Sequence, residues 1–178
     1  MTDNVESGDI KIHYCLINFI LASRSFYCLW FDDGKRDRFL TDTTNTLLYF
    51  ENENEIRNFC TAHNLNIQKN KAVCYNIDSF MHEFNLYDID CNIFLDYWNI
   101  ASDMAYTYSE HFIGDDDGPS GETVGVYDKL FYGNNLPALK KESSEVYIPI
   151  WERDELDIIQ AVFTDIKRIF HTCLGNLT

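Results

Sequence analysis

Runs of strand-forming side chains dominate the first half of the chain. Residues 25–31 and 38–41 are rich in such side chains, and the Asp-Gly pair at 33–34 between them favours a hairpin. Residues 46–50 predict a third, buried strand, and residues 72–76 predict a further one. The first half therefore predicts a small, mainly antiparallel sheet.

Two helix starts interrupt these strands. Asn52 is a typical N-cap residue, and Glu55 three positions later completes a capping-box pattern for a helix that ends near Asn64. Asp78 is expected to cap a short helical turn that runs through Phe84. Strands and helices in this order predict an α+β fold, with helices packed against the sheet.

The second half has the spacing of helices. Residues 91–112 predict a helix, because apolar side chains recur there at three- and four-residue steps. Asp96, Asp103 and Glu110 are seven positions apart, which places them along one face of that helix, opposite its aromatic side chains. A solvated face of a core helix is the simplest interpretation of this pattern.

Three further elements complete the expected order. Residues 126–131 predict a short helix, and residues 145–150 predict a strand that Pro149 restricts to an edge or an end. A final helix with acidic residues at its start is predicted up to a stop at Gly175. Its apolar stripe consists of Leu156, Ile159, Val162, Phe163, Ile166, Ile169 and Phe170. We expect one domain over residues 1–178, with a flexible N-terminus at 1–10.

Charge is distributed very unevenly along this pattern. Residues 72–128 contain twelve Asp or Glu residues and no Lys or Arg, so this window carries −12 of the formal net charge of −15. Like charges at this density repel one another and destabilise the folded state, so some advantage must offset this cost. Binding of a basic partner is one such advantage, and improved solubility of an aromatic-rich chain is the other.

Composition narrows the cellular context. The first ten residues are polar and acidic, unlike a signal peptide, and the most apolar stretch at 14–22 is too short to span a membrane. The six cysteines show no Cys-x-x-Cys spacing, which favours reduced and mostly buried thiols. We therefore expect a cytoplasmic protein that contacts neither a membrane nor nucleic acid, since phosphate binding requires Lys and Arg.

Motifs for metal binding and catalysis are missing from the sequence. The acidic run at 115–117 lacks the Gly and Glu positions of a calcium-binding loop, and the five histidines lack metal-ligand spacing. No nucleophile elbow or phosphate-binding loop occurs. The sequence predicts a protein that is not an enzyme, with no metal and no cofactor, although a small hydrolase stays open as the least favoured alternative.

Two segments resemble a known family of proteins. They are Tyr-Trp-Asn-Ile-Ala-Ser-Asp at 97–103 and Val-Tyr-Asp-Lys-Leu-Phe-Tyr-Gly-Asn-Asn-Leu-Pro-Ala at 126–138, followed by Trp151 and Glu155 at the start of the last helix. Together with the early strand, hairpin and helix order, they resemble bacterial immunity proteins encoded beside polymorphic toxins, of the contact-dependent growth inhibition type. The resemblance covers the general layout of residues 25–170.

This resemblance implies a small cytoplasmic protein that binds and neutralises one cognate toxin domain, often a nuclease. It implies no catalytic residues. We expect a monomer that forms a one-to-one complex and covers the active or substrate-binding surface of a basic toxin. The alternative is an acidic adaptor whose charge serves mainly solubility.

Clustering in the window without bases identifies the candidate toxin-binding residues. Carboxylates would supply the charge, and aromatic side chains beside them would anchor the contact. The candidates are Asp96, Asp103, Tyr106, Glu110, His111, Asp115, Asp116, Asp117 and Glu122.

Overall fold

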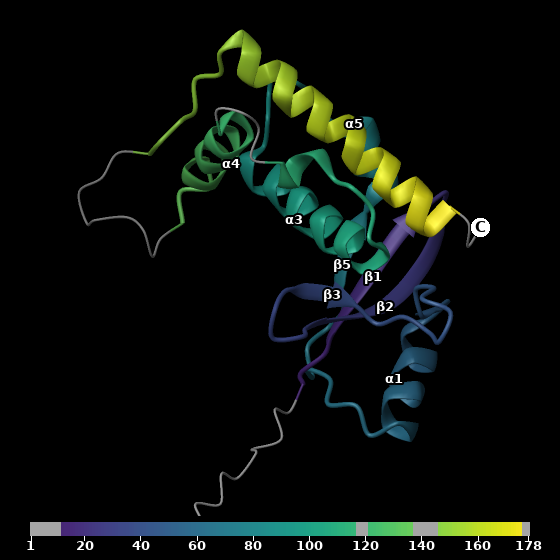
Figure 1. Cartoon of the computed structure of the whole chain (residues 1–178). Helices are drawn as coiled ribbons and strands as arrows, with labels where there is room; N and C mark the ends of the chain where they lie inside the picture. The colour runs from purple at the N-terminus through teal and green to yellow at the C-terminus, as the bar shows by residue number, and fades with distance from the viewer. Residues whose placement is uncertain (1–11, 117–120, 137–145, 176–178) are drawn as a thin grey trace, which may run out of the picture.

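Strands gather in the N-terminal half of the computed structural model of the chain, and helices make up the C-terminal half (Figure 1). The structure describes residues 12–116, 121–136 and 146–175, so the predicted flexible N-terminus lies outside the described residues. The strands are β1 (Cys15–Leu21), β2 (Arg24–Asp32), β3 (Asp37–Phe39), β4 (Tyr49–Phe50) and β5 (Val73–Asn76). The helices are α1 (Glu53–Ala62), α2 (Ile77–Glu83), α3 (Cys91–Tyr108), the short 3-10 helix η1 (Ile113–Asp115), α4 (Glu122–Gly133) and α5 (Arg153–Gly175). The predicted α+β class is confirmed.

The sheet has the order β3-β2-β1-β5, and β4 pairs with the same edge of β2 as β3 does. All pairs are antiparallel except β1 with β5, which are parallel. Strand β1 is central, yet the sequence pattern does not predict it. Leu16 packs on one side of the sheet and Ile17 and Phe19 on the other, so β1 is buried on both faces and, apart from Asn18, apolar, without the alternation of a half-exposed strand.

Helices cover both faces of this sheet. Helix α1 lies against one face, where Ile56 and Cys60 pack on Leu16 and Leu29. Helices α2, α3 and α5 pack on the other face, and α5 extends along α3 and α4 (Figure 1). The predicted apolar stripe of α5 is confirmed for six of its seven residues, and Leu156, at the start of the stripe, is half-buried. The six buried residues are Ile159, Val162, Phe163, Ile166, Ile169 and Phe170.

The β2–β3 hairpin and the start of α1 form as predicted. Gly34 has φ +85°, and its N–H donates to Asp32 Oδ1 at 2.7 Å. Asn52 caps α1 by accepting a hydrogen bond from the Glu55 N–H at 3.0 Å. The third strand is shorter than expected: only Tyr49–Phe50 pairs with β2, and both side chains are half-exposed.

Asp78 has a different role from the predicted cap. Asn76 caps α2, accepting from the Ser79 N–H at 3.0 Å. The Asp78 carboxylate accepts hydrogen bonds from the N–H groups of Ala22 and Ser23, each at 2.9 Å. These two residues form the β1–β2 turn with φ of 51° and 59°, a left-handed conformation that costs energy without glycine. The carboxylate stabilises a turn that no nearby residue caps.

Two predictions for the second half are wrong: the end of one helix and the presence of an edge strand. Helix α3 ends at Tyr108, not at residue 112, because Ser109 takes a left-handed φ of 57° and its N–H bonds back to Tyr106 and Ala105. The described residues 146–150 pair with no strand. Instead the Asn135 side chain bonds to the Tyr147 backbone N–H and C=O, each at 2.8 Å. A side-chain amide therefore takes the place of a neighbouring strand.

The cysteines are reduced and mostly buried, as predicted. All six cysteines are free thiols, four of them buried, and only Cys74 on β5 is exposed. No helix in the described part of the chain is both long and apolar enough to cross a membrane.

Candidate binding surface

Asp103 faces the sheet and does not belong to an outward acidic stripe. The Trp30 ring N–H, from β2, donates to Asp103 Oδ2 at 2.9 Å. Burial raises the pKa of Asp103 to about 6, and the nearby Asp37 and Asp115 charges act in the same direction. Seven-residue spacing places residues on one helical face. This face is half-covered because α3 packs on β3 and Asp103 contacts Trp30 of β2.

Asp115 and Tyr106 contact an arginine from outside the acidic window. Arg36, in the β2–β3 turn, donates to Asp115 Oδ2 at 2.8 Å and also to the Ser102 hydroxyl. Ser102 in turn donates to Asp115 Oδ1 at 2.5 Å. The Arg36 guanidinium lies 5.1 Å from the centre of the Tyr106 ring. Two of the predicted partner-binding side chains thus hold a base of the same chain.

A second arginine serves Glu110. Arg168, on α5, donates to Glu110 Oε2 at 3.3 Å, to Asp165 Oδ1 at 2.5 Å and to the His111 carbonyl oxygen. The His111 ring lies 3.0 Å from Asp116 Oδ1. Six of the nine candidate residues therefore gather around the C-terminal end of α3, and two of their four carboxylates, Asp115 and Glu110, pair with an arginine of the same chain.

The remaining three candidates lie elsewhere. Asp96 is exposed, about 10.5 Å along the axis of α3 from Asp103. Glu122 is exposed at the first turn of α4. Asp117 lies outside the described residues. The nine residues consequently do not form one continuous acidic patch.

A second acidic region, which the sequence did not identify, lies at the N-terminal end of α3. Two hollows of about 220 and 320 Å³ adjoin here and share Phe80, Glu83 and Ile93 in their lining. We call them together the acidic groove. Its carboxylates are Glu83, Asp88, Asp90 and Asp96, and neither hollow is lined by a Lys, Arg or His.

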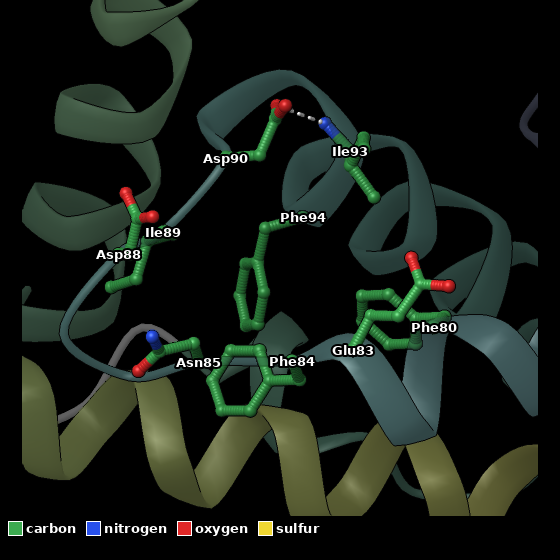
Figure 2. Close-up of a pocket in the computed structure, with 9 residues that line it drawn as sticks. All are labelled: Phe80, Glu83, Phe84, Asn85, Asp88, Ile89, Asp90, Ile93 and Phe94. Carbon is green, nitrogen blue, oxygen red and sulfur yellow. Dashed lines mark hydrogen bonds between the residues drawn. The ribbon is translucent and has the colours of Figure 1, made fainter.

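Aromatic side chains give the groove a rigid apolar floor. Phe80 on α2 stacks on Tyr97 of α3, with ring centres 3.9 Å apart and planes at 4°. Phe84 stacks in the same manner on Phe163 of α5, with centres 3.8 Å apart. Figure 2 shows Phe94 pointing from α3 toward Phe84, across the hollow from the Glu83 carboxylate. The floor is therefore fixed by packing between three helices.

The carboxylates of the groove differ from those near Asp115 in having no internal base. Glu83, Asp88 and Asp96 form no ion pair with any described residue. Asp90 caps α3 by accepting a hydrogen bond from the Ile93 N–H at 3.0 Å (Figure 2). Partial desolvation of Asp96 in the groove and the nearby Asp90 charge raise the pKa of this exposed carboxyl. A bound cation would relieve this repulsion.

The lining of the groove is acidic and aromatic. It brings four carboxylates together with aromatic rings but places no histidine or cationic group among them. A carboxylate–histidine pair of the kind that activates a nucleophile is therefore missing from this lining. Among the described residues, no three His, Cys, Asp or Glu side chains are placed to hold a metal ion.

Comparison of the chain with family models, with curated proteins and with solved structures gives no match.

Proposed function

We propose that this chain is an immunity protein that binds a basic toxin domain through the acidic groove. One observation carries the choice of surface: Glu83, Asp88 and Asp96 surround an aromatic floor without an internal base. The sequence resemblance described above supports the immunity class, and the overall charge of −15 supports a basic partner. Among the candidates that the structure describes, only Asp96 lies in this groove.

Inhibition would follow from occupancy of the partner's own basic surface. Unpaired carboxylates attract Lys and Arg from a distance and raise the association rate. The stacked aromatic floor then offers a preorganised apolar contact of the kind that provides most of the binding energy at interfaces. A nuclease whose phosphate-binding groove was covered in this way could not reach its substrate. One monomer would neutralise one toxin domain.

Association kinetics test this proposal. The probe is the C-terminal domain encoded immediately upstream of this gene, mixed by stopped flow at low and high salt with the wild type and with an E83Q/D88N/D96N variant. We expect the variant to associate about tenfold more slowly at low salt, and the difference to shrink as salt screens the charges. The variant E55Q/D154N/D157N is the matched control, because it removes the same charge at exposed positions outside the groove.

Two results would contradict the proposal. If that domain does not bind the wild-type chain, the immunity function is wrong for this pair of genes. If the domain binds but both triple variants behave as the wild type does, the charge serves solubility and the acidic groove is not the interface.

A further inference from the structure

Strand β5 forms an open edge of the sheet. It pairs with β1 alone, with Val73 opposite Ile17 and Asn76 opposite Ile20. On its other side, no backbone group of the described residues bonds to it. Because alternate residues of a strand direct their N–H and C=O groups to opposite edges, part of the β5 backbone is available for a further strand.

The side chains of this edge do little to prevent pairing. Proteins commonly protect an edge by keeping the strand very short or by placing charged side chains, proline or a bulge on it. Strand β5 is short, but all four of its residues are uncharged, and Val73 is 52 % exposed. Lys69 and Lys71 precede the strand but line neither hollow of the acidic groove. An incoming segment would therefore meet an uncharged edge.

The open edge of β5 lines the larger hollow of the acidic groove. The larger hollow is lined by every residue of β5, together with Glu83 from α2 and Asp96 and Tyr97 from α3. The Tyr75 ring packs edge-on against Tyr97, with centres 5.4 Å apart, so one face of β5 is directed toward α3. A chain laid beside β5 would direct every second side chain toward that face, where the carboxylates lie.

We propose that the partner presents an extended basic segment, which adds to β5 as a further strand of the sheet. Backbone hydrogen bonds to β5 would hold the segment, and alternate Lys or Arg side chains would meet Asp96 and Glu83. The remaining side chains would lie beside Cys74 on the opposite face. This inference rests on the proposed function, since it names the kind of segment that the groove recognises.

Peptide probes can separate backbone pairing from simple charge attraction. The reference probe is a capped peptide of about eight alternating Lys and Val residues, a typical strand length. Two isomers carry N-methyl groups on all Lys or on all Val residues, so each lacks the donors of one edge only. Binding is measured by titration at low salt, and protection of the β5 amides is measured by hydrogen exchange.

We expect the reference peptide to bind and to slow exchange within Val73–Asn76. One N-methylated isomer should lose about tenfold in affinity, because hydrogen bonds to β5 disappear, and the other should bind as the reference does. The E83Q/D96N variant should bind each of these peptides more weakly than the wild type does, by a similar factor.

Equal affinity of both isomers would overturn strand addition, and so would no binding of the reference peptide. If E83Q/D96N still weakened the toxin domain in either case, the acidic groove would stand as the interface. The proposed function is tested separately: it is wrong if the toxin domain binds the groove variants as well as it binds the wild type.

Discussion

The two ends of α3 carry similar numbers of carboxylates but treat them differently. At the C-terminal end, Arg36 and Arg168 reach in from other elements and pair with Asp115 and Glu110. At the N-terminal end, Glu83 and Asp96 have no such partner among the described residues. The local density of acidic residues is thus a poor guide to a binding surface. What matters is whether the fold supplies a base.

Charge reversal should produce the largest difference between the two ends. We expect E83K/D96K to lower the association rate with the basic partner about a hundredfold at low salt, because attraction becomes repulsion. Reversal of Asp154 and Asp157, which are exposed on α5, should change this rate only a few fold through net charge. Stopped-flow mixing at two salt concentrations measures both.

The sequence-based interface assignment is tested by the corresponding reversal of Asp115 and Asp116. If this variant, still folded, lowers the association rate more than E83K/D96K does, the interface centre lies at the C-terminal end of α3. The order of the two rates therefore decides between the ends.

Removal of Arg36 should expose the cost of crowded carboxylates. We expect Arg36→Ala to lower the free energy of unfolding by about 2 kcal/mol, a value that includes solvent screening of this part-exposed pair. The loss arises because Asp115 and Ser102 lose a charged hydrogen-bond donor and Asp103 loses a nearby cation. Lys35→Ala, at the exposed neighbouring position, should change it by less than about 0.5 kcal/mol. Urea denaturation provides the values, and equal effects of the two variants would mean that the Arg36 contacts add nothing.

Asp103 should make stability depend on pH in an unusual direction. Its pKa in the folded protein is raised to about 6, whereas an unfolded Asp titrates near 3.8, so the folded state holds an extra proton between these values. This contribution to stability is complete below pH 3.8 and is lost as the pH rises through 6.

Asp103→Asn removes this titration but keeps an acceptor for Trp30. Relative to the wild type, we expect the free energy of unfolding of the variant to rise by about 1–2 kcal/mol between pH 4 and pH 7. Denaturation at both pH values measures the difference. A difference that is constant with pH would mean that Asp103 titrates normally.

The smallest expected effect is a difference in stability between variants of Asp78, which accepts two hydrogen bonds, and of Asp88, which has no such partner among the described residues. Asp78→Asn leaves only one acceptor oxygen for the Ala22 and Ser23 N–H groups, and we expect a loss of about 1 kcal/mol. Asp88→Asn, in the acidic groove, should leave stability unchanged or raise it slightly, since it relieves repulsion. Thermal unfolding compares the two, and an equal loss in both would remove the distinction.

Local patterns were sufficient for the elements whose stabilising contacts are close in sequence. The cap at Asn52, the Gly34 hairpin and the stripe of α5 all depend on residues within a few positions of each other. The β1 strand was not predicted, because a central strand that is buried on both faces lacks the alternation of apolar and polar residues that marks a half-exposed strand.

The candidate site was harder to predict for a related reason. The ion pair between Arg36 and Asp115 joins residues 79 positions apart, and the bond from Trp30 to Asp103 joins residues 73 apart. Nothing in the local sequence shows that these partners meet. The acidic groove likewise requires β5, α2 and α3 to be placed together, so its residues are scattered between 73 and 97.

The Asp78 carboxylate also constrains how the protein folds. The β1–β2 turn holds two non-glycine residues in a left-handed conformation, and their anchor is 55 or more positions away on α2. A hairpin formed early from residues 15–32 would therefore remain strained until α2 docked beside it. Closing that long loop costs chain entropy before the anchor can form. The central hairpin and the β5–α2 edge should consequently become stable in a single cooperative step, and the edge that the partner is proposed to meet would be completed together with the middle of the sheet.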